Sequence, residues 1–196
     1  MQTNAKTGRL VGMAFLVAII VVLQILATAL ASALPFAITL TLFPIVVGAA
    51  MYGAGAGAAL GGVFGVVVLV LCISGADKSG FILWSANPIL TAVLCLAKGA
   101  AAGYAAGLIY ALAAKKNQYL GVLCSAVICP VTNTGIFLAA LYFLYRETLI
   151  EWAGVNPLLY YLFVLVAGVN FLLEFGLNVV LSPGIVRIIN AVKKHR

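Results

Sequence analysis

Long apolar segments separated by short polar connections make up almost the whole chain of 196 residues. Hydropathy predicts six membrane spans, at residues 10–33, 38–52, 54–73, 88–114, 119–145 and 157–189. A helix of about 20 apolar residues crosses the hydrocarbon core of a bilayer. The pattern therefore predicts an all-α polytopic membrane protein, with one transmembrane domain over residues 1–196.

Two of these segments depart from the usual length of a span. Residues 38–52 are short for a perpendicular crossing, so we expect neighbouring helices to shield them or the connection at Leu34, Pro35 and Phe36 to extend them. Residues 157–189 are long, and we expect that helix to tilt or protrude.

Charged residues are few and lie mostly at the ends of the apolar segments. The chain is 65% hydrophobic and 8% charged, with a net charge of +7. With both termini inside, the outer connections carry only Lys78 and Arg146 as basic residues, so the positive-inside rule favours cytoplasmic termini. Basic residues placed at helix ends set topology, and we predict no nucleic-acid partner.

A polar hexad, Pro130 to Gly135, interrupts the apolar span at 119–145 near its midpoint. Amides and hydroxyls at that depth need partners, so Thr132, Asn133 and Thr134 predict a buried polar site. Two alternatives assign these side chains to bonds between adjacent helices, or to the hydrogen bond that Pro130 removes.

A second polar set lies on the last span. If the two helices run in opposite directions, Asn133 and Asn170 lie at comparable depths and can face one cavity. Glu174 follows Asn170 by one helical turn, on the same face. Lys98 lies at mid-depth on the fourth predicted span, where it can pair with Glu174, hold a ligand, or do both.

Trp84 and Asn87 precede Pro88 at the outer start of the fourth predicted span. Either these residues line an entrance to the site or the tryptophan anchors the chain at the membrane interface, as aromatic residues often do.

Small residues repeat every four positions, as Gly53, Gly57, Gly61 and Gly65 and as Gly99, Gly103 and Gly107. Such ladders let helices approach closely. Ala14 and Ala18 form a shorter ladder on the first span, which packs either inside the chain or against a partner.

Signatures of catalysis are missing from the sequence. There is no phosphate-binding loop of the Walker type, no His-Glu-x-x-His and no Gly-x-Ser-x-Gly, so we predict neither an enzyme nor a cofactor. The four cysteines lie in or beside apolar spans without metal-ligand spacing. We predict no metal site.

The chain resembles the substrate-binding membrane subunit, or S component, of energy-coupling factor (ECF) vitamin transporters. The resemblance covers nearly the whole chain and rests on its length, its six spans, the alanine ladder, the connection at 34–36 leading into 43–49, and the glycine-rich turn at 51–57. The nearest members are those of the riboflavin and pantothenate type.

This resemblance implies a vitamin pocket near the outer side, walled by the first loop, which includes Phe36, and by helices four to six. Asn133 and Asn170 resemble the pocket asparagines of riboflavin-binding members, and Asn87 is a candidate for another polar contact. Those members carry a lysine one turn past the second asparagine. The present chain departs from the pattern, with Glu174 in that region.

The resemblance also implies partners and a mechanism. Ala14 and Ala18 match the ladder with which S components dock on a shared transmembrane coupling subunit, itself bound to two cytoplasmic ATPase subunits in a bacterial cell membrane. The loaded subunit then topples in the lipid bilayer to deliver its vitamin inward. The alternative function is a stand-alone, ion-coupled secondary carrier, in which Lys98 and Glu174 relay protons or bind an ion.

Overall fold

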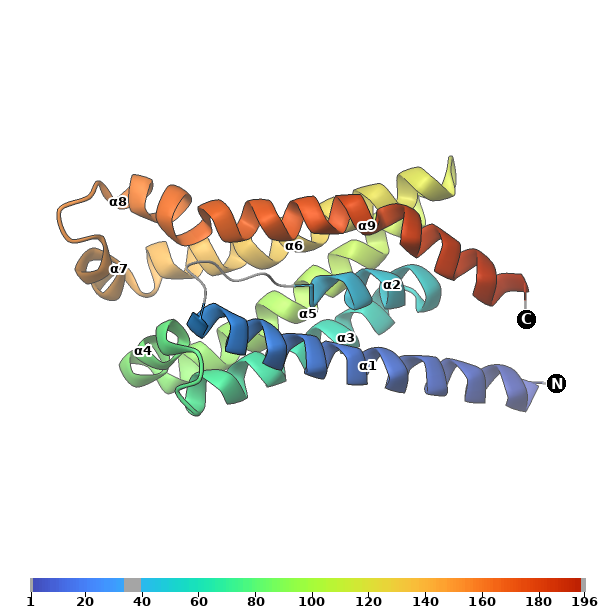
Figure 1. Ribbon diagram of the computed structural model, residues 1–196, viewed down its shortest axis with the longest axis horizontal. Helices are drawn as coiled ribbons and strands as arrows, with labels where there is room; N and C mark the ends of the chain where they lie inside the picture. The colour runs from blue at the N-terminus through green and yellow to red at the C-terminus, as the bar shows by residue number, and fades with distance from the viewer. Residues whose placement is uncertain (1, 34–39, 195–196) are drawn as a thin grey trace.

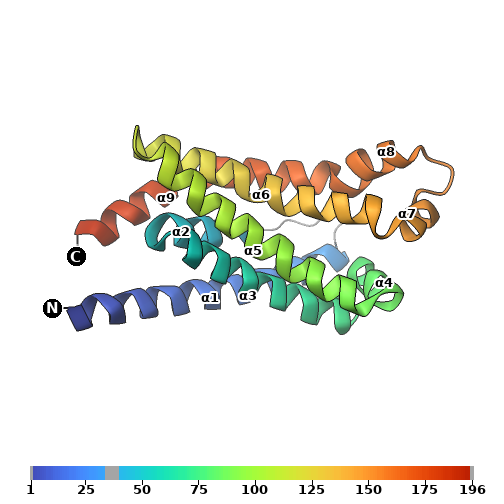
Figure 2. The ribbon, with the colours of Figure 1, turned by 180° about the vertical axis from the view of Figure 1, so that it is seen from behind.

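The protein is a bundle of helices lying side by side, as a computed structural model shows (Figures 1 and 2). The structure describes residues 2–33 and 40–194, without the side chains of 2–5, 32–33, 169–170 and 193–194. Within these ranges there are helices and connections but no strand. The all-α fold predicted from the sequence is confirmed.

The described ranges contain ten helical elements. In chain order they are α1 (Gln2–Ala33), α2 (Leu42–Tyr52), α3 (Ala54–Ile73), α4 (Lys78–Ala86), α5 (Pro88–Ala113), α6 (Gln118–Phe143), α7 (Arg146–Ala153), α8 (Leu158–Tyr160), the π-helix η1 (Tyr161–Gly168) and α9 (Val169–Lys194).

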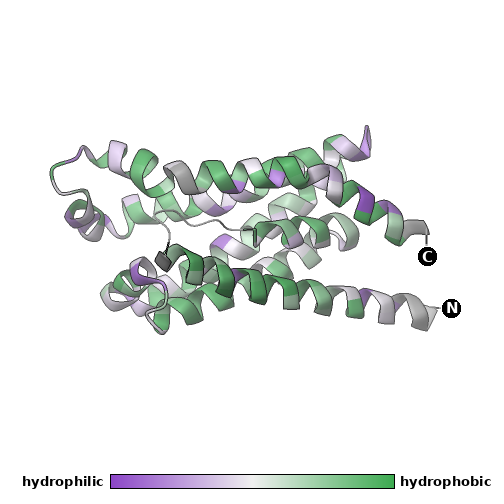
Figure 3. Cartoon of the chain, in the orientation of Figure 1, coloured by the Kyte–Doolittle hydropathy of each residue, from purple (hydrophilic) through white to green (hydrophobic). Residues whose placement is uncertain are grey.

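Five helical segments of the described chain are long and apolar enough to cross a membrane. They are Lys6–Ala31, Ala54–Ile73, Pro88–Ala113, Gln118–Phe143 and Leu158–Val192. Figure 3 shows hydrophobic residues along the middle of the long helices and polar residues gathered toward the ends of the bundle. α4 and α7 are short helices within connections that hydropathy placed outside the membrane.

α2 is the sixth apolar helix, and it is buried in the bundle. Its 11 residues span about 16 Å, roughly half of a bilayer core. It packs against α1, α3, α5, α6 and α9, so its neighbours shield it from lipid. It begins at Leu42, whereas the predicted span began at residue 38. Gly53, with φ of 91°, makes the turn from α2 into α3.

α3 and α5 pack more extensively than any other pair of described helices, and glycine makes this possible. A Cβ atom on Gly57 would overlap the carbonyl oxygen of Gly103, and one on Gly61 would overlap that of Gly99. The contacts run antiparallel in steps of four residues, as small-residue packing between membrane helices requires. These glycine ladders therefore pack against each other inside the chain.

The C-terminal membrane segment is irregular. η1 has π-helical backbone and continues directly into α9. Such π-helical stretches are rare and often occur at functional sites. Residues of η1 and α9 pack against α6, which remains one helix through Pro130.

The two chain ends lie at one end of the bundle, together with the turn between α5 and α6, while α4 and α7 lie at the other end (Figure 1). The first end carries the basic residues Lys6, Arg9, Lys115, Lys116 and Arg187, and the second carries Asp77, Lys78, Arg146, Glu147 and Glu151. This segregation matches the charge division from which the sequence predicts cytoplasmic termini.

Candidate functional site

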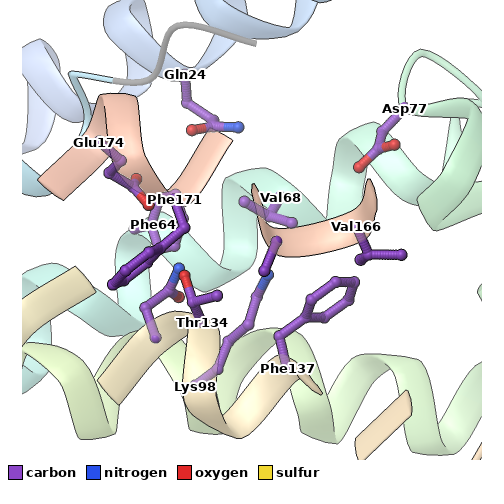
Figure 4. Close-up of a pocket in the computed structure, with 12 residues that line it drawn as sticks. Gln24, Phe64, Val68, Asp77, Lys98, Thr134, Phe137, Val166, Phe171 and Glu174 are labelled. Atoms are coloured by element: carbon purple, nitrogen blue, oxygen red, sulfur yellow. The ribbon is translucent and has the colours of Figure 1, made fainter. Parts of the chain in front are cut away.

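A cavity of about 240 Å³ lies among the helices. Figure 4 shows side chains from α1, α3, α5, α6 and the C-terminal segment converging on it. Six of its twelve lining residues are aliphatic or aromatic, and the other six are polar or charged. The lining residues are Gln24, Phe64, Val68, Asp77, Lys98, Asn133, Thr134, Phe137, Val166, Ala167, Phe171 and Glu174.

The structure brings together four residues that the sequence assigned to the site. Lys98 on α5, Asn133 and Thr134 on α6, and Glu174 on α9 all line the cavity. They are far apart in sequence, and the packing of α6 against α5 and α9 joins them. The cavity is thus the place where the polar interruptions of three membrane helices meet.

Asn133 is buried, with 8% of its surface exposed, and its Oδ1 atom has no hydrogen-bond partner among the described residues. Burial of an amide oxygen without a partner costs free energy, on the order of 1–3 kcal/mol. Such a group at the wall of a cavity is suited to a hydrogen-bond donor on a bound molecule.

Lys98 is half-buried and reaches from α5 into the cavity (Figure 4). Its ammonium lies 4.9 Å from the centre of the Phe137 ring, within the range of a cation–π contact. Among the described residues it forms no ion pair, so the pairing with Glu174 suggested by the sequence is absent from this part of the chain. The ring attracts the ammonium, but it is not an ion-pair partner.

The two carboxylates of the cavity have different surroundings. Asp77 begins α4, where its Oδ1 accepts a hydrogen bond from the Gly80 backbone N–H at 3.0 Å. Glu174 is buried, and its backbone carbonyl accepts a hydrogen bond from the Asn178 side-chain amide at 2.8 Å. Asp77 is therefore part of a helix cap as well as of the cavity wall.

Gln24 is a lining residue that the sequence interpretation missed. Its Oε1 accepts a hydrogen bond of 3.0 Å from the Thr41 hydroxyl, and both residues are buried. Thr41 stands at the N-cap of α2, but its side chain makes this bond instead of capping the helix. An amide side chain within the apolar first span was the available signal for Gln24.

Asp77 and the aromatic wall were missed for a different reason. Asp77 lies in a connection, and Phe64, Phe137 and Phe171 look like any other apolar residue of a span. Only the packing of the helices shows which aromatic rings face a cavity.

Three of the residues predicted from the sequence do not line this cavity. The Asn87 side chain accepts a hydrogen bond from the Leu90 N–H at 3.0 Å, so it caps α5 directly before Pro88. Trp84 is half-buried on α4, and Thr132 is half-buried on α6. Asn170 belongs to α9 one turn before Glu174, but its side chain lies outside the described part of the chain, as does the whole of Phe36.

Ala14 and Ala18 lie on the outer surface of α1. Both are exposed, whereas Leu16 and Ile20 of the same helix are buried in the core. Ala27, further along α1, is also buried, with 3% exposed. The ladder at positions 14 and 18 therefore faces away from the rest of this chain.

The fold and the cavity together define a class: a polytopic helical membrane protein with a cavity among its helices. The family model described as "ECF transporter, substrate-specific component" matches residues 8–186. The chain therefore belongs to the family of substrate-specific components of ECF transporters. No curated protein and no solved structure matches it.

Proposed function

We propose that this chain captures a vitamin or a related small precursor in the cavity, as the substrate-binding subunit of an ATP-driven ECF importer in a bacterial plasma membrane. Membership of the family supports this role. The observation that carries the assignment of the cavity is the buried Oδ1 of Asn133, which lacks a partner within the described chain and borders the space. A ligand that donates a hydrogen bond would satisfy it.

The walls of the cavity suit binding. Ligand sites combine apolar surface with polar groups that fix the orientation of the ligand. Here the rings of Phe64, Phe137 and Phe171 supply apolar surface, and the amide and charged side chains of the wall can fix the orientation of a ligand. The site holds groups for recognition, which fits a protein that carries its substrate unchanged.

Coupling to ATP requires partner subunits, and α1 offers a surface for one. Ala14 and Ala18 are exposed and small, so another helix can approach the backbone of α1 closely at these positions. We assign this face, flanked by the exposed Leu10 and Phe15, to the shared transmembrane coupling subunit, which carries two ATPase subunits. A cytoplasmic location of both termini would then place the opposite end of the bundle, with α4 and α7, outside the cell.

The test is uptake into proteoliposomes from a macromolecule-free extract of bacterial cells, followed by mass spectrometry of the lumen. We expect one or a few compounds to accumulate when the chain is reconstituted with its coupling subunit, both ATPases and Mg-ATP. None should accumulate with the chain alone under a proton or sodium gradient. Accumulation by the chain alone under a gradient would contradict the proposal and favour a secondary carrier.

A further inference from the structure

The charge of the Lys98 ammonium is the strongest indication of what the cavity binds. The ammonium lies 4.9 Å from the centre of the Phe137 ring, and no carboxylate of the described residues lies at ion-pair distance from it. A charge in a membrane interior is costly unless it is paired or reaches water. An anionic group on a ligand would supply the missing partner.

The carboxylates of the cavity are less available to a ligand. Asp77 Oδ1 accepts from the Gly80 N–H at the start of α4, and Oδ2 lies 4.0 Å from the Cys72 sulfur. Glu174 is buried and is engaged within the chain. The ammonium of Lys98 is therefore the charged group best placed to meet a ligand.

Asn133 adds a second requirement. Its Oδ1 is a pure acceptor, so its missing partner is an N–H or O–H group. Asn133 and Lys98 come from different helices, α6 and α5, and both line the same space. A molecule that satisfies both must carry an anionic group and a hydrogen-bond donor.

The size and the remaining walls limit the rest of the molecule. A volume of about 240 Å³ lies just below the usual range of ligand sites, about 300–1,000 Å³, which favours a small metabolite. Phe64, Phe171 and Val68 would contact an apolar portion. A phosphate would carry about two negative charges, which the single ammonium would balance only in part and which the two carboxylates of the wall would repel.

We propose that the cavity selects a small monocarboxylate that also carries a hydroxyl, amide or amine donor, with its carboxylate on Lys98 and its donor on Asn133. This inference rests on the proposed function and narrows it to a substrate class. A neutral compound or a simple cation would give the Lys98 ammonium no ion-pair partner.

The test uses a macromolecule-free extract of bacterial cells as the probe, in two forms. One is native, and in the other the carboxyl groups have been converted to methyl esters. The purified protein is incubated with each, separated by gel filtration, and the retained compounds are identified by mass spectrometry. We expect the wild type to retain a monocarboxylate from the native extract and to retain at least about tenfold less of its ester.

Variants of Lys98 test whether the carboxylate of the ligand lies on this residue. Lys98→Gln should lower retention of that monocarboxylate by at least about tenfold, and Lys98→Arg should keep part of it because the charge remains. Lys78→Gln, which removes an exposed lysine at the start of α4, is the matched control and should bind as the wild type does. Since Lys98 has no ion pair to lose within the described chain, Lys98→Gln should melt at or above the wild-type temperature.

The outcomes separate the two proposals. Retention of nothing from either extract would overturn the proposed function together with this inference. Retention of a neutral, cationic or phosphorylated compound, or equal retention of acid and ester, would overturn the substrate class and leave the binding function standing. If Lys98→Gln does not fold, the comparison of native and esterified extracts with the wild type still tests whether the ligand must carry a free carboxylate.

Discussion

Asn133 combines three properties that point to ligand binding. It is buried, its side-chain oxygen has no partner in the described chain, and it borders a cavity that also holds Lys98. A polar atom without a partner is costly at bilayer depth, so its presence there indicates a functional role. Ligand binding in the cavity should therefore depend first on this residue.

Replacement of Asn133 by Leu should weaken binding of the compound that the wild type retains. The loss of one hydrogen bond to a desolvated ligand corresponds to about 1–3 kcal/mol, or roughly tenfold or more in affinity. The thermal stability of the empty protein should not fall, because the substitution also removes an unsatisfied buried atom. Titration calorimetry and melting curves in detergent measure the two effects.

Asn190→Leu is the matched control for this prediction. Asn190 is exposed on α9 and accepts a hydrogen bond from the Gln118 side chain at 3.0 Å, away from the cavity lining. The Asn190→Leu substitution should leave the dissociation constant of the retained compound unchanged. Equal dissociation constants for the wild type, Asn133→Leu and Asn190→Leu would contradict a role of Asn133 in ligand binding and assign it to helix packing.

At the scale of single residues, the sequence predicts the polar members of the site better than its shape. Lys98, Asn133, Thr134 and Glu174 are conspicuous because polar residues are rare in apolar spans, and all of them reach the cavity. Asn87 was assigned to an entrance or to a ligand contact, whereas its side chain caps α5 directly before Pro88. The aromatic wall could not be predicted, because every span offers apolar side chains on all faces.

The glycine ladders of α3 and α5 decide how closely these two helices pack. A Cβ on Gly61 would overlap the carbonyl oxygen of Gly99, whereas a Cβ on the adjacent Gly62 would meet nothing within 4 Å. The two positions have the same residue type and nearly the same depth. They therefore make a matched pair for testing the packing.

Gly61→Ala should lower the melting temperature, because the helices must move apart or strain to accept a methyl group, at a cost of about 1–3 kcal/mol. Gly62→Ala should leave stability unchanged or raise it by up to about 1 kcal/mol, since alanine favours a helix. Thermal unfolding of both variants measures the difference. Equal melting temperatures would show that α3 and α5 are not in backbone contact at this point.

Substitutions on the outer face of α1 should abolish transport and leave ligand binding intact. Ala14→Trp and Ala18→Trp should preserve expression and ligand retention, since both positions are exposed, yet abolish ATP-driven uptake by blocking close approach of a partner helix. Retention assays and proteoliposome uptake are the two measurements.

Ala27→Trp is the opposite control on the same helix. Ala27 is buried, with 3% exposed, so a tryptophan there should destabilise the isolated protein by overpacking its core. If the variants at 14 and 18 lose stability and binding as Ala27→Trp does, the ladder is internal packing and the docking assignment fails.

At the scale of elements, hydropathy predicts the long helices well and the short ones poorly. The predicted ranges 54–73, 88–114 and 119–145 lie within a few residues of α3, α5 and α6. α4 and α7 were not predicted, because short helices in polar connections carry no long apolar run. The π-helical backbone of η1 has no signature in hydropathy, and it supplies Val166 and Ala167 to the cavity.

The whole molecule has two ends of different charge, and this asymmetry predicts its orientation in the membrane. In a background with Cys72, Cys95, Cys124 and Cys129 replaced by alanine, a cysteine at Lys116 should resist a membrane-impermeant thiol reagent in intact cells. A cysteine at Lys78 should react, because Lys78 lies at the α4 end of the bundle. The reversed pattern of labelling would show that the chain has the opposite orientation in the membrane.

The central claim is that the cavity between α1, α3, α5, α6 and the η1–α9 segment is where this ECF substrate-specific component holds its substrate. An experimental structure of the protein, solved with the compound that it retains from cell extract, tests this most directly. We predict that the compound lies among Phe64, Lys98, Asn133 and Phe171, with a donor within hydrogen-bond distance of Asn133 Oδ1. A compound bound elsewhere, with Asn133 still without a partner, would contradict this claim.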